Sequence, residues 1–458
     1  MPGCVVPRAA SPTRVGWRTL GPKRETLLSR TSQDMNPPHV FVARPASDMM
    51  SVRQVLDIVL SNTECLDSEV VALREAAYRV AAEDVLAPAG FPPFPASIMD
   101  GYAVVAADGP GEYPVAGQVM AGHPAGYVQE PGQVSYITTG APMPEGADAV
   151  VRIEDTEPSG DRVRIKVGVQ PGHDVRQAGS DMAPGTLVVR AGSVLGPAEL
   201  GLAATAGAGT VAVTRRPRVS VLSTGDELQP PGEPLGPGQI PDSNHVMLSA
   251  MAQRMGCDVR PRTAIAEDTE SQLGQEVRGS LRQSDLIITS GGISMGEADL
   301  LPKVLTDCGA EIHCERVLMK PGKPFTFSSW QAASGDWRCV VCSLPGNPAS
   351  AMVTFLLFCV PALRRMLGHQ PPALPRIQVV LDSELVPDST RPEFHRVALA
   401  WDHDLHQGMG GYRAASTGAQ RSSRLLSMLD ADALITVPPG SQPLPSGSTV
   451  AAIDLRHL

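Results

Sequence analysis

Two features with opposite electrostatic preferences stand together in DLIITSGGISMGEAD, residues 285–299. Residues 285–289 form an apolar run that predicts a buried strand. A glycine turn between a strand and a helix favours an anion, because free N–H groups and the helix dipole point toward it. The carboxylates of Glu297 and Asp299, where the helix is expected to begin, would repel that anion. A divalent cation between them removes the conflict. Ser290, Gly291 and Gly292 are predicted to form this turn and to bind the substrate.

Three carboxylates are predicted at the edge where a doubly wound sheet binds its ligands. They belong to Glu227, Asp268 and Asp299. Mg²⁺ prefers oxygen ligands and commonly bridges carboxylates to substrate phosphates, so the cluster predicts a magnesium site. Taken singly, such acids cap helices or are solvated, and that alternative stays open. The loops expected to meet at this edge are residues 223–228, 266–268, 290–299 and 344–350.

Cations gather in RVLMKPGKPFTF, residues 316–327, where Arg316, Lys320 and Lys323 flank a rigid Pro-Gly turn. A lysine ammonium is a compact charge suited to an oxyanion, and proline holds such a loop in one shape. Two lysines beside a turn can equally be solvated surface. Their position near LPGNPAS and the carboxylates favours an oxyanion site.

The segment PPFPASIMDGYAV, residues 92–104, follows neither a helical nor a strand period. Asp100 in it can serve simply as a turn residue. Thr139, Arg176 and Asp181 are further polar candidates in neighbouring segments. No Walker loop and no Ser/His/Asp order stands out. The residues alone therefore predict a Mg²⁺-dependent enzyme that acts on a phosphorylated or oxyanion ligand.

Strand–turn–helix units recur from residue 219 and predict a doubly wound α/β domain with a parallel sheet. Short strands between glycine and proline turns predict small β domains on both sides of it. An N-terminal part would contain two helices, at 51–62 and 68–85. The helices expected in the α/β domain lie near residues 245–255, 270–282, 299–308 and 348–367. The expected parts are a disordered tail at 1–47, an N-terminal domain at 48–97 and 176–218, an inserted β domain at 98–175, the α/β domain at 219–367 and a C-terminal β domain at 368–458.

Composition excludes several classes of function. The net charge of −10 argues against nucleic acid as a partner, because phosphate binding needs basic surface. Cys339 and Cys342 fall in an apolar strand where they would point to opposite faces, which favours core packing over zinc or redox chemistry. The apolar stretch 351–363 is too short to span a bilayer and predicts a buried helix. These features are typical of a reduced, cytoplasmic protein, although the Arg-rich tail leaves organelle targeting open.

Eight motifs occur here in the order found in the molybdopterin molybdenumtransferase family, which the chain resembles over about residues 50–458. The C-terminal segments RPEFHRVALAW and STGAQRSSRLLSM resemble the gephyrin E domain in particular. The motifs are PPFPASIMDGYAV, TTGAPMPEGADAVVRIEDT, STGDEL, DSNHVML, TSGGISMGEAD, MKPGKP, LPGNPAS and SSRLLSM.

The resemblance implies a homodimer of four-part subunits with an α/β domain like that of the molybdopterin adenylyltransferases. It also implies Mg²⁺-dependent cleavage of adenylylated molybdopterin with insertion of molybdate, giving molybdenum cofactor and AMP. By this resemblance, Glu227, Asp268 and Asp299 would hold Mg²⁺, and the partner subunit would supply Asp100, Thr139, Arg176 and Asp181. The molybdate pocket would be formed by Lys320, Lys323, Pro324, Arg396 and Ser423. The pterin side would be lined by Arg316, Pro345, Pro348 and Ser350.

Two alternatives remain beside the enzyme. One is a gephyrin-like scaffold that has lost catalysis, but it would not need the carboxylates and lysines together. The other is the adenylyltransferase itself, which the flanking β segments and MDGYAV argue against. Because the chain has a single α/β domain, the adenylyltransferase is expected to be a separate protein, and molybdenum enzymes would accept the product.

Overall fold

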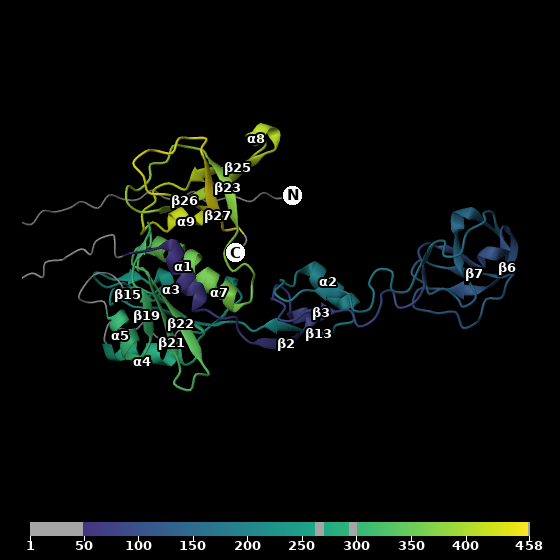
Figure 1. Cartoon of the computed structure of the whole chain (residues 1–458), viewed down its shortest axis with the longest axis horizontal. Helices are drawn as coiled ribbons and strands as arrows, with labels where there is room; N and C mark the ends of the chain where they lie inside the picture. The colour runs from purple at the N-terminus through teal and green to yellow at the C-terminus, as the bar shows by residue number, and fades with distance from the viewer. Residues whose placement is uncertain (1–48, 262–269, 293–299, 457–458) are drawn as a thin grey trace, which may run out of the picture. The chain divides into compact units, whose positions relative to one another are not determined.

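The computed structural model describes residues 49–261, 270–292 and 300–456 (Figure 1). The predicted tail at 1–47 lies outside these residues. The two loop segments 262–269 and 293–299, which contain Asp268 and Asp299, also lie outside them.

The α/β domain is built on a six-stranded sheet. Its first four strands are parallel, as the sequence predicts. The fifth strand pairs antiparallel with both of its neighbours, so the expectation of a wholly parallel sheet is wrong at this edge. β21 and β22 are joined by a short turn, and only antiparallel neighbours can be connected that closely. In sheet order the strands are β17 Asp258–Val259, β14 Arg218–Ser223, β18 Leu286–Ser290, β22 Arg338–Leu344, β21 Thr326–Gln331 and β19 Glu311–Cys314.

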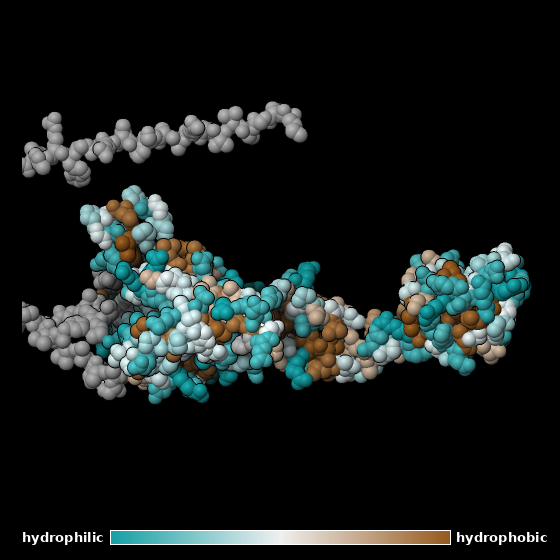
Figure 2. Space-filling model, turned by 90° about the horizontal axis from the view of Figure 1, so that it is seen from above, coloured by the Kyte–Doolittle hydropathy of each residue, from teal (hydrophilic) through white to brown (hydrophobic). Residues whose placement is uncertain are grey.

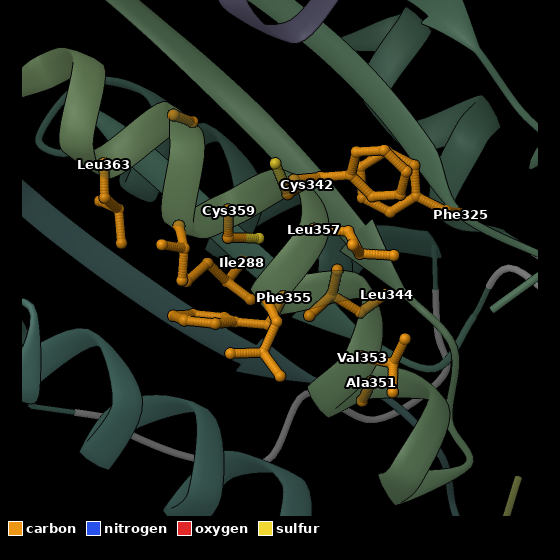
Figure 3. Packing of buried hydrophobic residues seen from close by; sticks show 14 of the residues in the cluster. Ile288, Phe325, Cys342, Leu344, Ala351, Val353, Phe355, Leu357, Cys359 and Leu363 are labelled. Atoms are coloured by element: carbon orange, nitrogen blue, oxygen red, sulfur yellow. The ribbon is translucent and has the colours of Figure 1, made fainter. Parts of the chain in front are cut away.

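Helices cover both faces of this sheet, and each predicted helix of the domain is present. One core contains Ile288 and Cys342 together with α1 (Val52–Ser61) and the helical run Pro348–Met366. Figure 3 shows Phe355, Leu357 and Cys359 of that run packed near Ile288 and Leu344. The run is long and apolar enough to cross a membrane, but 83% of it is buried inside the protein. The helices are α3 Ser243–Arg254, α4 Glu270–Leu281, α5 Leu301–Asp307, α6 Pro348–Thr354, the π-helix Phe355–Cys359 and α7 Val360–Met366.

Cys339 and Cys342 lie on opposite faces of β22, which confirms the interpretation of this pair as core residues. The cysteines of the described residues are free thiols. Burial raises the pKa of the Cys339 thiol well above its usual value. Since the thiolate is the reactive form, this thiol should be inert in the folded protein.

Thiol labelling with a small disulfide reagent tests that expectation. Exposed Cys65 is expected to react in the native protein, whereas Cys339 and Cys342 should react only after unfolding. Mass-spectrometric mapping of labelled peptides identifies each site. Equal labelling of Cys65 and Cys339 before unfolding would contradict this picture of the core.

The prediction of a second helix at residues 68–85 is wrong. The segment begins with β2 (Ser68–Ala72), continues as a short 3₁₀ turn at Leu73–Glu75, and ends near β3 (Val85–Leu86). All five residues of β2 pair antiparallel with β13 (Thr210–Thr214). β-Branched residues in both strands fit a pleated surface, and this distant pairing outweighs the local helical pattern. β12 (Leu187–Val189) and α2 (Pro197–Thr205) complete this part.

The inserted segment forms its own six-stranded β sheet, whose strands pair mainly antiparallel. Two short strands, β4 (Ala96–Ser97) and β11 (Val175–Arg176), pair where the chain enters and leaves it. In sheet order the strands are β8 Ala149–Arg152, β5 Gly101–Val104, β7 Val134–Ile137, β6 Gly111–Val119, β10 Arg162–Ile165 and β9 Thr156–Ser159.

The C-terminal part is a closed barrel, in agreement with the predicted β domain. Closure leaves no free sheet edge. The barrel strands are β23 Arg376–Leu381, β25 Gly411–Ser416, β24 Glu393–Asp402, β26 Ala433–Val437 and β27 Thr449–Asp454.

On the face of the molecule shown in Figure 2, hydrophobic areas are separated by hydrophilic ones, the usual pattern for a folded surface.

Candidate active site

Three of the four loops expected at the ligand edge begin there, and of the loop 290–299 the structure describes residues 290–292. β14, β18 and β22 end in register, with Ser223 beside Ser290 and Ser290 beside Leu344. The loops that follow these strands therefore begin side by side at the carboxyl edge of the sheet, where such folds bind ligands. The fourth loop, residues 266–268, lies outside the described residues.

The glycine turn is packed tightly against the neighbouring loop. Gly291 and Gly292 have φ of +89° and +65°, and a Cβ on Gly291 would stand 2.6 Å from the Thr224 carbonyl oxygen. Only glycine fits such a backbone without strain. The Gly291 N–H donates to the Leu344 carbonyl at 3.2 Å. This N–H is therefore engaged, so the expectation of a free amide for an anion is wrong at Gly291.

Of the three predicted metal ligands, only Glu227 belongs to the described residues. It is exposed at the same edge, and its carboxylate lies over Gly225, where an added Cβ would stand 2.5 Å from Oε2. Within residues 49–261, 270–292 and 300–456, no group of three His, Cys, Asp or Glu is placed to hold a metal ion. A carboxylate at a phosphate-binding edge is the donor type that Mg²⁺ takes.

A cavity of about 510 Å³ adjoins the loop after β22. It brings together five residues that the sequence predicted: Lys320, Lys323, Pro324, Pro345 and Ser350. It also contains residues that sequence reasoning missed: Arg391, Gln420, Arg421, Ser422 and Asn347. They lie inside or beside the RPEFHR, STGAQRSS and LPGNPAS motifs, so the same motifs could have indicated them. Lys320, Lys323, Arg391 and Arg421 thus bring four cationic groups to one cavity.

Lys320 is held in this cavity by the barrel. Its N–H donates to Pro392 at 2.9 Å, and its carbonyl accepts from Phe394 at 2.8 Å. Its Nζ lies 3.4 Å from Glu393 Oε2 and 3.5 Å from Asp388 Oδ2. An ammonium has three donors, so two carboxylates leave one for an oxyanion.

Arg396 and Ser423 do not line the cavity. The Arg396 side chain is fully buried and donates to Ser427 Oγ at 3.0 Å and to the Arg421 carbonyl at 3.1 Å. Burial lowers the pKa of Arg396 to about 10, against an opposing effect of nearby Glu393. Arg396 thus holds the backbone of Arg421, a residue that lines the cavity, through a hydrogen bond to its carbonyl.

Arg316 and Pro348 also lie outside the cavity lining. Pro348 begins α6, a position that suits its missing N–H. The Arg316 carbonyl accepts from the Met50 N–H at 3.3 Å, beside the paired strands β1 (Met50–Ser51) and β20 (Val317–Leu318). Both residues flank loops that do contribute to the cavity.

The four residues expected from a partner subunit form two local pairs. Thr139 donates to Asp100 Oδ1 through its N–H at 2.7 Å and its hydroxyl at 3.0 Å. Arg176 Nε donates to Asp181 Oδ1 at 2.9 Å. The pairing of β4 with β11 brings the two pairs to the same end of the inserted domain. Each pair can serve folding there, and their contribution to an active site stays a prediction.

The structure is that of an α/β protein with appended β domains and a cavity lined by lysine and arginine side chains. Residues 50–207 match the MoeA N-terminal region (domain I and II), 220–365 a probable molybdopterin binding domain, and 378–455 the MoeA C-terminal region (domain IV). The chain belongs to the molybdopterin molybdenumtransferase family, which confirms the resemblance predicted from its motifs.

Individual relatives show the extent of this similarity. A molybdopterin molybdenumtransferase of Nostoc sp. is 35% identical over 433 residues, covering 92% of this chain and 97% of that protein. A gephyrin of Dictyostelium discoideum is 37% identical over 451 residues, and the match covers 89% of this chain but only 62% of that gephyrin. A crystal structure of the molybdopterin biosynthesis MoeA protein from Pyrococcus horikoshii is 30% identical with a TM-score of 0.74, covering 89% of this chain and 99% of that one.

Proposed function

We propose that the protein is a molybdopterin molybdenumtransferase that cleaves adenylylated molybdopterin, inserts molybdate, and releases molybdenum cofactor and AMP. The observation that carries this proposal is the cavity in which Lys320, Lys323, Arg391 and Arg421 gather beside the loop after β22. A tetrahedral oxyanion fits such a group of donors, and the neighbouring carboxyl edge suits the phosphates of a dinucleotide-like substrate.

The chain's own residues would perform defined tasks. Lys320, fixed by Glu393 and Asp388, would present one N–H to a molybdate oxygen. Lys323 and Arg421 would share the remaining charge at the cavity wall. Donors that are already fixed stabilise developing negative charge without a cost of reorganisation during the reaction.

Glu227, together with Asp268 and Asp299, would hold Mg²⁺ at the carboxyl edge. When bound, the ion would stabilise charge on the phosphate oxygens. The exposed Glu227 carboxylate beside Gly225 fits that task by position and donor type.

Direct molybdate binding tests the oxyanion cavity. Equilibrium dialysis, with protein-bound molybdenum measured by mass spectrometry, is expected to give saturable binding that added sulfate weakens. Each ammonium and guanidinium contributes through charge, so binding should weaken as salt increases. Molybdate binding that does not saturate and does not change with salt concentration would contradict the proposed role of the cavity.

We further propose a homodimer in which Asp100, Thr139, Arg176 and Asp181 complete the site of the other subunit. A separate adenylyltransferase would supply the substrate, and molybdenum enzymes would accept the cofactor. Mixing two inactive variants, Asp100→Ala and Lys320→Ala, tests the shared site. Random exchange should restore about a quarter of wild-type activity, since half of the dimers are mixed and each has one intact site.

The outcome of this mixing experiment separates two arrangements. If every residue of a site came from a single chain, no mixed dimer would contain an intact site, and activity would stay at the level of the variants. Each variant incubated alone under the same exchange conditions is the control.

The similarity to gephyrin supports a second candidate, a scaffold without catalysis. Such a protein would have no need of four cations in one cavity. Folded protein that binds neither molybdate nor a molybdopterin nucleotide would favour it.

A further inference from the structure

The amide of Asn244 lies at the junction of all three described loops of the carboxyl edge. Asn244 belongs to the first turn of α3, just after its N-cap residue Asp242. The Asp242 carboxylate accepts from Ser223 Oγ at 3.1 Å and from the His245 N–H at 3.0 Å. The start of α3 is therefore attached to the end of β14, which fixes where Asn244 stands.

Asn244 uses both of its N–H donors on the other two loops. Nδ2 donates to Ser290 Oγ, at the end of β18, at 2.6 Å and to the Gly346 carbonyl, after β22, at 2.7 Å. A carbonyl can only accept, so the NH₂ group and not the oxygen must face Gly346. The side chain is 8% exposed, and its Oδ1 has no hydrogen-bond partner among the described residues.

Two further close approaches join the described residues of these two loops. The Gly291 N–H donates to Leu344 at 3.2 Å, and a Cβ on Gly346 would lie 3.8 Å from Gly291 Cα. The loop after β22 contains Pro345, Asn347 and Ser350, which line the oxyanion cavity. Asn244 itself does not line that cavity. Its effect on a ligand must therefore pass through the loop that it holds.

We propose that Asn244 is a positioning residue that fastens the loop 345–350 to the glycine turn and thereby sets the shape of the oxyanion cavity. The expected effect on kinetics rests on the proposed function. The attachment of the loop to the glycine turn does not depend on it. A buried amide that merely stabilised α3 would leave the exchange of loop amides and the affinity for molybdate unchanged.

Hydrogen exchange in the ligand-free protein tests the fastening. In Asn244→Asp a carboxylate oxygen replaces the NH₂ group and faces the Gly346 carbonyl, so both donations are lost while the shape is kept. Peptides covering 286–292 and 344–350 are expected to exchange about tenfold faster, whereas barrel peptides keep their wild-type rates. Unchanged exchange in both loop peptides overturns the proposal.

Two further variants keep this test decisive. Asn62→Asp is the matched control, because Asn62 Nδ2 also donates to a backbone carbonyl, that of Ile58 at 2.9 Å, but at the end of α1. It should leave both loop peptides unaffected. If Asn244→Asp fails to fold, Asn244→Ser, which keeps a single donor, takes its place and should give a smaller acceleration in the same peptides.

Steady-state kinetics then test the positioning. The KM for molybdate is expected to rise about tenfold in Asn244→Asp and to stay unchanged in Asn62→Asp. Faster exchange with an unaltered KM would overturn the positioning role. If the wild-type protein shows no molybdate-dependent AMP release, the proposed function fails, and the exchange result still decides whether Asn244 fastens the loops.

Discussion

Replacing Lys320 by methionine is expected to lower molybdate-dependent turnover about a hundredfold, which corresponds to about 2.7 kcal/mol. Methionine is an unbranched side chain only one atom shorter than lysine, and it removes the charge. The variant would also leave Glu393 and Asp388 without their shared cation, and these carboxylates would then repel the oxyanion. The rate of AMP formation as a function of molybdate concentration measures the effect.

Lys303→Met is the matched control for this substitution. Lys303 also pairs with a carboxylate, that of Glu270 at 2.8 Å, but its side chain is exposed on α5. An exposed pair contributes little, so activity and stability should stay near wild type. Equal losses in the two variants, or full activity in Lys320→Met, would contradict the role of Lys320.

Replacing Phe325 by alanine is expected to lower the free energy of unfolding of the α/β domain by about 3–5 kcal/mol. Phe325 follows Pro324 of the cavity loop, is fully buried, and stacks on Phe358 with ring centroids 4.4 Å apart. Its ring therefore attaches the cavity loop to the hydrophobic core shown in Figure 3. Chemical denaturation followed by tryptophan fluorescence measures the change.

Phe94→Ala serves as the control for this prediction, because the Phe94 side chain is 42% exposed. A surface substitution of this kind should change stability by about 0.5 kcal/mol or less. If Phe325→Ala were as stable as wild type, the packing described for the cavity loop would be wrong.

The sequence predicted the parts of the fold whose signal is local. β18 and β22 are continuous apolar runs because both faces of the sheet are covered, and such runs are bounded by glycine and proline. The local pattern of residues 68–85 predicts a helix because it does not reveal β13, a partner strand more than a hundred residues away. Propensity cannot account for such pairing.

The candidate site likewise contains residues that a local motif predicts and residues that only the tertiary structure brings together. Lys320 and Lys323 could be predicted because a short motif places both charges beside a rigid turn. Arg391 and Arg421 stand in the RPEFHR and STGAQRSS motifs, but they enter the cavity from separate barrel segments, so the sequence does not show that they lie beside Lys320. Asn244 resembles an ordinary polar residue near a helix start, and only the tertiary structure reveals its two bonds across the loops.

Molybdate-dependent cleavage of adenylylated molybdopterin is the activity proposed for this protein. AMP release from that substrate by the purified protein with Mg²⁺, measured with and without molybdate, tests it most directly. Release that depends on molybdate and is lost in Lys320→Met is the predicted result. Folded protein that releases no AMP under either condition would contradict the claim, and the cations around Lys320 would then serve a binding role alone.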